Sequence, residues 1–307
     1  MSWKKSDAAL ALSLAFAVFL WGGNNAGTKF IVASWPPVWT GATRFLGAGG
    51  LLLAALRWTR WFGPRRVLPP ALRRQLWLRG GLSLAAYIVV FNWALRLTAA
   101  SHVALYLGAS PVWALVWEGR PERNWKSFSR YAAALLALAG VGILFWPALK
   151  SARGHWLGEA LGLLGSFLWT LYGRQCRVLG ASLSSVEISA HAMTQAGLIL
   201  LPVGAWEVAR HGLPWRGDVA LVQLYCVVAG GVAAYCIWNH ALSRWPTSQV
   251  LLFNNLIPLS TMSWARVCLG EPVTPTFGLA MLLIVLGVVL GQTNWQKVLA
   301  AASLPPE

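Results

Sequence analysis

Asn92-Trp93-Ala94-Leu95 in the first half of the chain recurs in the second half as Asn239-His240-Ala241-Leu242. The two copies are separated by roughly 147 positions, and other residues repeat at the same offset. These further pairs are Ser101 and Ser248, Pro111 and Pro258, Trp117 and Trp264, Gly140-Val141 and Gly287-Val288, and, one residue further apart, Trp21 and Trp169. The chain is therefore predicted to be an internal duplication.

The composition places both copies in lipid. Of the 307 residues, 57% are apolar and only 11% are charged, which leaves too little polar surface for a soluble domain of this size. The formal charge of +16 comes from basic residues that cluster between apolar runs. Membrane topology and anionic lipid explain that clustering better than nucleic acid does.

Ten apolar stretches are long enough to cross roughly 30 Å of hydrocarbon as helices. They lie at about 8–32, 38–56, 77–97, 101–118, 128–147, 157–178, 184–206, 219–242, 247–268 and 274–292. The first is expected to be a span and not a cleaved signal, because its apolar core is long and no A-x-A site follows it. Repeats with an odd number of spans must enter the bilayer from opposite sides, which is the architecture of alternating-access transporters.

The basic residues also predict the orientation. With the N-terminus in the cytoplasm, 17 basic residues lie inside and 6 outside, and the segment from Arg57 to Arg79, which lacks acidic residues, dominates this bias. We expect two repeats, residues 1–150 and 151–307, joined near Lys150 to His155, with both termini cytoplasmic. Nine spans instead of ten would move the C-terminus outside.

Short motifs in a fixed order carry a family resemblance. They are Trp21-Gly22-Gly23-Asn24 running to Lys29, Trp35-Pro36-Pro37 followed by Arg44-Phe45, Ala139-Gly140-Val141-Gly142, Pro258, Leu269-Gly270-Glu271-Pro272-Val273-Thr274 and Leu286-Gly287-Val288. With them the chain resembles the EamA-type ten-span permeases of the drug/metabolite transporter superfamily. It departs from that pattern at Glu118-Gly119-Arg120-Pro121-Glu122, where the family usually shows Gly-Glu-Arg.

The resemblance implies an all-α fold, with paired helices around a central cavity. Spans five and ten would lie outside the substrate path. It also implies export of small metabolites such as amino acids, across the inner membrane of a bacterium.

Two ionisable residues inside the predicted spans are strong candidates for a functional role. Each charge inside hydrocarbon costs at least about 2.5 kcal/mol on the insertion scale. Lys29 and Arg44 lie towards the outer ends of spans one and two, where they either reach the interface or contact substrate. A guanidinium can hold a carboxylate in a bidentate pair, so a cation facing the cavity favours an anionic or zwitterionic substrate.

Span one also carries amides beside glycines. Asn24 and Asn25 follow Gly22-Gly23 just past mid-membrane, and amides in lipid need partners or water. This pattern predicts a segment that lines the cavity or is locally unwound. Hydrogen bonding between helices without substrate contact is the alternative.

Further candidates recur at helical spacing in other spans, where residues three or four apart share a face. They are Tyr87, Phe91 and Asn92, their counterparts Tyr235, Trp238 and Asn239, then Asn254, Asn255 and Pro258, and finally Trp21 and Trp169. Spans three and eight are repeat mates, so the same face is expected to line the cavity twice. Simple packing is the alternative for each aromatic residue.

The sequence gives less support for a coupling ion than for a substrate site. His191, with Gln195 one turn later, is the one histidine well inside a predicted span and could titrate near neutrality. A neutral histidine bonded between helices is the alternative. No carboxylate lies centrally in a predicted span, which favours facilitated diffusion or exchange over proton coupling.

Other classes of function fit less well. The five histidines lack ligand spacing and no HExxH or GxSxG occurs, so we expect no enzyme, metal or cofactor. The four cysteines lack metal spacing and are expected to pack as small hydrophobic residues. A lipid flippase of the same fold, or a scaffold, remains the alternative. The spacings Gly158 to Gly162 and Gly287 to Gly291 serve packing within the bundle of a monomer or contacts in a homodimer.

Overall fold

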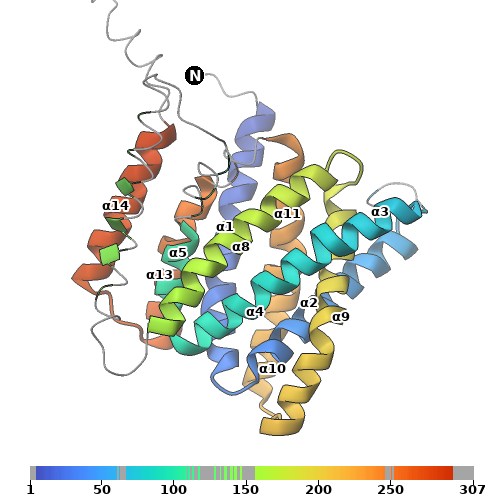
Figure 1. Ribbon diagram of the computed structural model, residues 1–307, viewed down its shortest axis with the longest axis horizontal. Coiled ribbons are helices and arrows are strands. Elements are labelled where there is room, and N and C mark those ends of the chain that lie inside the picture. The colour runs from blue at the N-terminus through green and yellow to red at the C-terminus, as the bar shows by residue number, and fades with distance from the viewer. Residues whose placement is uncertain are drawn as a thin grey trace, which may run out of the picture.

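The computed structural model describes residues 5–60, 62, 67–108, 156–245, 250 and 252–292, together with isolated positions between 110 and 146. All regular secondary structure in these residues is helical (Figure 1), which confirms the all-α prediction. The helices are α1 (Lys5–Val32), α2 (Pro37–Trp58), α3 (Pro70–Gln75), η1 (Leu76–Gly81), α4 (Leu82–Leu97), α5 (Ala100–Gly108), α8 (Trp156–Leu179), α9 (Ser185–His211), α10 (Gly217–Tyr225), η2 (Cys226–Ala233), α11 (Ala234–Arg244), η3 (Leu252–Asn255), α13 (Leu256–Leu269) and α14 (Pro275–Gln292).

Helix lengths agree with a chain that crosses a membrane. Within the described residues, four helical stretches are long and apolar enough for this: Ala8–Val32, Pro70–Leu97, Ser185–His211 and Gly217–Arg244. The third span begins at Pro70, earlier than expected, because Pro69 and Pro70 start a helix that continues without a break into η1 and α4. Most of the predicted span 128–147, the Glu118 to Glu122 segment and the junction from Lys150 to His155 lie outside the described residues, so the count of ten stays a prediction.

The two repeats run in opposite directions. The end of α1 lies beside the start of α8, because the Lys29 ammonium donates to the Thr98 carbonyl at 2.6 Å and the Thr98 hydroxyl donates to Glu159. The start of α2 lies beside the end of α9, because the backbone N–H of Val38 donates to the Glu207 carboxylate at 2.8 Å. First and second helices of the two repeats are therefore antiparallel, as inverted repeats require.

The third helix of each repeat contains a wide, π-helical segment. These segments, η1 and η2, both include a glycine pair that allows close packing on the second helix of the other repeat. A Cβ on Gly81 would lie 2.6 Å from the Cβ of Gln195 in α9, and a Cβ on Gly231 would lie 2.8 Å from the Cβ of Ala48 in α2. Because π-helical turns occur frequently at functional sites, they direct attention to the middle of the bundle.

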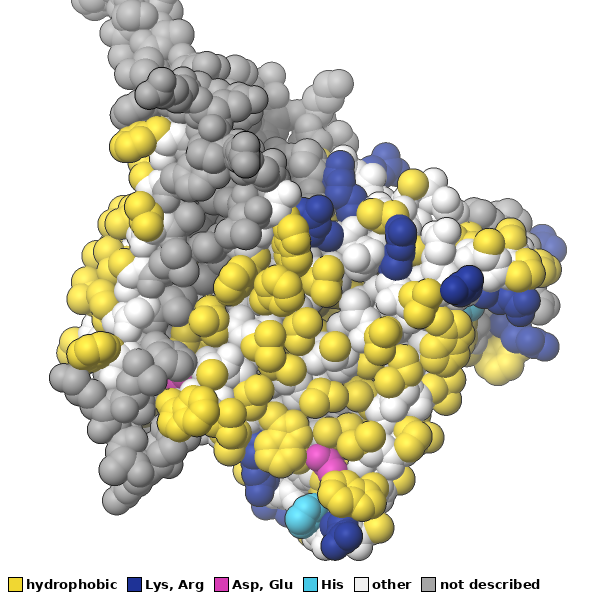
Figure 2. Space-filling model, in the orientation of Figure 1, with side chains coloured by type: hydrophobic (Ala, Val, Ile, Leu, Met, Phe, Trp, Pro, Cys, Tyr) yellow, Lys and Arg dark blue, Asp and Glu magenta, His cyan; other side chains and the backbone are white. Residues whose placement is uncertain are grey.

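The outside of the bundle is apolar along its middle and basic at one end. Figure 2 shows hydrophobic side chains over much of one face, with Lys and Arg towards its edges. Examples of exposed apolar side chains are Leu12, Phe16, Leu221 and Leu224. Such a surface is stable only against lipid or another protein.

Two names are used below for the ends of the bundle. The Glu159 end holds the end of α1, the end of α4 and the start of α8, and the Arg177 end holds the end of α2, the end of α8 and the end of α11. Among the residues whose side chains the structure describes, the Arg177 end carries Arg57, Arg60, Arg73, Arg74, Arg79, Arg174, Arg177 and Arg244 with one acidic residue, Glu187. The Glu159 end carries Lys29, Arg96, Arg210, Arg216 and Arg266 with Glu159, Glu207, Asp218 and Glu271.

Glu207 is expected to be a strong stabilising residue. It is buried, and its carboxylate accepts hydrogen bonds from the backbone N–H groups of Val38 at 2.8 Å and Trp39 at 3.2 Å, in the first turn of α2. Glu207→Ala leaves these donors unpaired and should lower the free energy of unfolding by roughly 1–3 kcal/mol, measured by thermal unfolding in detergent.

Glu187→Ala is the control, because Glu187 caps only its own helix at an exposed position through the Ser184 N–H and hydroxyl. We expect a loss under about 1 kcal/mol for it. Equal losses for the two variants would contradict the special role of Glu207.

Candidate functional site

A small cavity lies at the centre of the bundle, where the two repeats meet. Its volume is about 20 Å³, which holds about one or two water molecules and no metabolite. The residues that line it are Trp21, Asn24, Asn25, Arg44, Phe45, Tyr87, Ile88, Phe91, Leu107, Trp169, Gly230, Gly231, Tyr235 and Ile257. The described conformation therefore has no room for a metabolite here, and a substrate requires the surrounding helices to separate.

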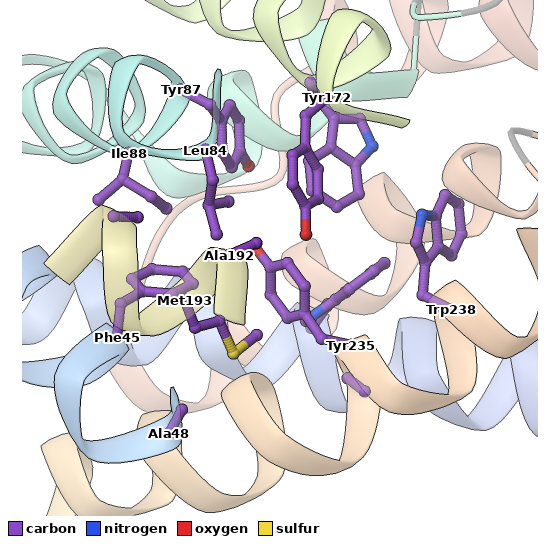
Figure 3. Close-up of a cluster of buried hydrophobic side chains, with 14 of the residues drawn as sticks. Phe45, Ala48, Leu84, Tyr87, Ile88, Tyr172, Ala192, Met193, Tyr235 and Trp238 are labelled. Atoms are coloured by element: carbon purple, nitrogen blue, oxygen red, sulfur yellow. The ribbon is translucent and has the colours of Figure 1, made fainter. Parts of the chain in front are cut away.

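Aromatic rings from both repeats form the cavity wall symmetrically. Trp21 and Trp169, the repeat mates, are perpendicular, with ring centroids 5.3 Å apart. Tyr235 packs against Trp21 at 5.3 Å, and Tyr87 packs against Trp169 at 5.1 Å. Each tyrosine thus contacts the tryptophan of the other repeat. Figure 3 shows Tyr87, Tyr172 and Tyr235 gathered around this centre, with Trp238 beside them.

Arg44 is the cation of the cavity. It is 2% exposed, and its guanidinium donates to the Thr28 hydroxyl at 2.8 Å and to the Asn24 side-chain oxygen at 3.3 Å. Its Nε has no hydrogen-bond partner, and no carboxylate among the described residues lies within ion-pair distance of it. The guanidinium carbon lies 4.8 Å from the Phe45 ring centroid. The charge is therefore buried among neutral groups with one donor unused.

The amides of span one are packed tightly beside this cation. A Cβ on Gly230 would lie 2.4 Å from the Asn24 side-chain oxygen, so the glycine is needed for this approach. Asn25 donates to the Thr261 hydroxyl at 3.0 Å, which ties α1 to α13. Helix α1 is continuous from Lys5 to Val32, so these residues line the cavity and the segment is not unwound.

The two walls of the cavity differ in chemistry. The first repeat contributes Asn24 and Arg44, whereas the second contributes Trp169, Tyr235 and an apolar surface behind them. Asn24 follows Trp21 by three residues, but the residue at the same place after Trp169 is Tyr172. The amide and cationic side chains of the cavity lining therefore all come from the first repeat, which suits a ligand with a charged head and an apolar body.

Eight of the predicted site residues line this cavity: Trp21, Asn24, Asn25, Arg44, Tyr87, Phe91, Trp169 and Tyr235. Lys29 does not. Its ammonium donates to the carbonyls of Leu95 at 2.7 Å and Thr98 at 2.6 Å, and Arg96 in turn donates to the carbonyl of Val32. The last-turn cations of α1 and α4 thus bind the negative C-terminal end of each other's helix.

Asn92 and Asn239 are also outside the cavity, in equivalent places. Asn92 donates to the carbonyl of Pro37 at 2.8 Å, in the first turn of α2. Asn239 donates at 2.7 Å to the hydroxyl of Ser189, which itself donates to the Ser185 carbonyl in the first turn of α9. Each asparagine therefore fastens the third helix of its repeat to the start of the second.

The remaining predicted residues are not on the cavity wall. Trp238 is fully buried, with its ring centroid 5.0 Å from that of Trp21. Asn254 is fully buried, and neither side-chain polar atom has a hydrogen-bond partner in the described part of the chain. His191 is half-buried on α9, away from the cavity-lining residues, so its role in proton coupling stays an untested prediction.

Several lining residues were not singled out from the sequence. They are Phe45, Ile88, Leu107, Gly230, Gly231 and Ile257. Phe45 adjoins Arg44 within one of the motifs, and Gly230-Gly231 is a glycine pair one turn before Tyr235, so both carried a usable signal. The aliphatic residues carried none, because they are indistinguishable from lipid-facing residues in an apolar helix.

Comparison with known proteins agrees with this architecture. A model of the EamA-like transporter family matches residues 9–146 and 156–291. An uncharacterized transporter of Archaeoglobus fulgidus is 25% identical over 85% of this chain and 89% of its own length. The uncharacterized transporter YvbV of Bacillus subtilis is 25% identical over 95% of this chain and 94% of its own length. The uncharacterized protein PA1977 of Pseudomonas aeruginosa is 30% identical over 80% of this chain and 80% of its own length.

A solved crystal structure shares the fold. It has a TM-score of 0.65 at 18% sequence identity and covers 95% of this chain and 99% of its own. The family match, which includes both repeats, confirms the resemblance inferred from the motifs. The chain belongs to the EamA-like transporter family and is a multi-pass membrane transporter.

Proposed function

We propose that this transporter exports small metabolites that carry a carboxylate, whether anionic or zwitterionic, with amino acids among them. The substrate would bind in the central cavity and cross by alternating access of its two inverted repeats. The observation that carries the proposal is the buried Arg44 guanidinium, which has no carboxylate partner among the described residues. Export is the direction that the family resemblance implies.

A substrate carboxylate would complete the surroundings of Arg44. A charge in the hydrocarbon region that lacks a counterion is costly, and a guanidinium presents donors in a planar fork that suits a carboxylate. The unpartnered Nε leaves one donor for such a ligand. The Asn24 and Thr28 oxygens hold the guanidinium in place from the other side. Arg44 is thus positioned to bind an acid group without a large change of its own partners.

The aromatic wall supports an apolar or aromatic body on the substrate. Rings of Trp169 and Tyr235 line the same cavity as Arg44 and present flat apolar surfaces. Aromatic side chains contribute large buried areas and pack well against rings or aliphatic groups. Because Arg44 repels cations, a purely cationic substrate is disfavoured.

For the orientation we propose that the Arg177 end faces the cytoplasm of a bacterium, with both chain termini on that side. The support is the distribution of charge, since the cations whose side chains are described at that end are accompanied by a single such acidic residue, Glu187. Cytoplasmic loops of membrane proteins carry an excess of Lys and Arg.

The test is counterflow in liposomes that contain the purified protein. Substrates are paired so that only the carboxylate differs, such as phenylalanine with phenylalaninamide and 3-phenylpropionate with its amide. We expect each acid to exchange at least about tenfold faster than its amide, as loss of a charged hydrogen bond predicts. Equal rates for acid and amide would contradict the role assigned to the carboxylate.

The flippase alternative is separated in the same preparation. Fluorescent phospholipids are included in the liposomes, and their movement between leaflets is followed with a quencher. Lipid flipping without exchange of any acid would replace metabolite transport by the flippase function.

A further inference from the structure

At the Glu159 end, a cation of the first repeat binds the backbone carbonyl of the residue at which the third helix of that repeat ends. The Lys29 ammonium donates to the carbonyl of Thr98 at 2.6 Å and to that of Leu95 at 2.7 Å. Thr98 is the C-cap residue of α4, so the lysine binds the negative end of this helix. We call this contact the Lys29 clasp.

At the Arg177 end, the second repeat makes the same contact. The Arg177 guanidinium donates to the carbonyl of Trp245 at 2.6 Å, and Trp245 is the C-cap residue of α11. We call this contact the Arg177 clasp. Like Thr98, Trp245 ends the third helix of its repeat.

The two clasps occupy equivalent positions in the duplicated sequence. Arg177 follows Trp169 by eight residues, as Lys29 follows Trp21. In addition, Trp245 follows Asn239 by six residues, as Thr98 follows Asn92 by six. Because the repeats are inverted, one of these two equivalent contacts lies at each end of the bundle. The cavity lies between them, since Trp21 and Trp169 line it two helical turns before each cation.

We infer that the Lys29 clasp and the Arg177 clasp are the two gates of alternating access, of which one breaks in each open state. This inference rests on the proposed transport through the central cavity. Each clasp holds the first helix of a repeat to the end of the third, and these two helices flank the cavity on both sides. Both clasps are formed in the described structure, and its cavity is too small for a metabolite.

The clasps differ in strength. Lys29 is half-buried and binds two carbonyls, and the α4 to α5 connection that it holds is also bound by the Glu159 and Glu271 carboxylates, the latter through the Ala100 N–H at 2.9 Å. Arg177 is exposed and binds one carbonyl among the described residues. Exposed charged contacts are weakened by water. The protein should therefore open more often at the Arg177 end.

The experiment measures access to the cavity from each side of the membrane. Ile88→Cys, introduced on the cavity wall after the four native cysteines are replaced by alanine, is labelled with a membrane-impermeant thiol reagent in right-side-out and inside-out vesicles. Lys29→Met should raise the labelling rate about tenfold from the side of the Glu159 end only. Arg177→Met should raise it from the opposite side only, and less, because its clasp is weaker.

Matched controls remove a cation at each end without breaking a clasp. Arg210→Met and Arg244→Met do this at exposed positions and should leave both labelling rates unchanged. Lys29→Arg and Arg177→Lys keep a cation and should restore nearly normal rates. If a methionine variant does not fold, Lys29→Gln and Arg177→Gln, which keep a neutral donor, give the same side-specific comparison.

The inference is overturned if both methionine variants raise labelling from the same side, or if folded variants change neither rate. Labelling requires no substrate, so these outcomes are independent of the carboxylate test. If acids and amides exchange at equal rates while each methionine variant still raises labelling from its own side only, the proposed substrate class is contradicted and the assignment of the gates is supported. If the methionine variants do not change labelling from either side while acids still exchange faster than amides, the assignment of the gates is contradicted and the proposed substrate class is supported.

Discussion

Arg44→Gln is expected to lower counterflow of the preferred acid about a hundredfold, because truncating one partner of a buried, hydrogen-bonded charge pair costs roughly 2–5 kcal/mol. The glutamine amide still reaches towards Asn24 and Thr28, but it cannot neutralise a carboxylate. Initial rates of exchange at a fixed amount of reconstituted protein measure this effect. Arg44→Lys should lose about tenfold, since an ammonium restores the charge without the planar fork of donors.

The same variant is expected to be at least as stable as the unchanged protein. Arg44 is 2% exposed and has no acidic partner among the described residues, so its removal relieves a desolvation cost. Residues that bind a ligand are often retained although they lower the stability of the protein. Thermal unfolding in detergent, with Arg210→Gln as the exposed control, measures it. Reduced stability together with normal exchange would assign Arg44 a structural role between α1 and α2.

The duplication predicted the architecture well. Repeated residues such as Trp21 and Trp169 lie at the centre. The contacts of Thr98 with Lys29 and Glu159, and of Glu207 with Val38, confirm that the repeats are inverted. The sequence supports this level of description because a polar or aromatic residue repeated within apolar helices marks a place where both repeats meet the same environment.

The roles of individual polar residues were harder to predict. Lys29 and Arg44 looked alike in the sequence, since both are cations near the ends of neighbouring spans. Their difference depends on distant partners, the carbonyl of Thr98 for the lysine and the hydroxyl of Thr28 for the arginine. Helical periodicity shows which residues share a face, but it does not show which helix that face meets.

The π-helical segments and the closed cavity also depend on tertiary packing. The wide turns of η1 and η2 coincide with glycine pairs, and Gly81 and Gly231 accept neighbours closer than a side chain would allow. A glycine pair in a span predicts close packing in general. It does not predict the partner, which here is the second helix of the other repeat.

Gly49→Ala is expected to separate α2 from α9 and to lower the free energy of unfolding by roughly 1–3 kcal/mol or more. A Cβ on Gly49 would lie 2.4 Å from the Thr194 hydroxyl oxygen and 2.5 Å from its backbone nitrogen, and the backbone cannot rotate away as a flexible side chain can. Gly50→Ala on the same helix is the control, because nothing lies within 4 Å of its added Cβ. That change should be neutral or stabilise by up to about 1 kcal/mol through helix propensity.

The inverted symmetry extends this prediction to the second repeat. Gly49 faces Thr194 and lies three residues after Leu46, whereas Gly197 faces Leu46 and lies three residues after Thr194. A Cβ on Gly197 would lie 2.8 Å from the Leu46 backbone nitrogen. Gly197→Ala should therefore lose as much stability as Gly49→Ala in the same thermal unfolding measurement. A large loss at only one of the two glycines would mean that α2 and α9 do not meet on the twofold axis of the repeats.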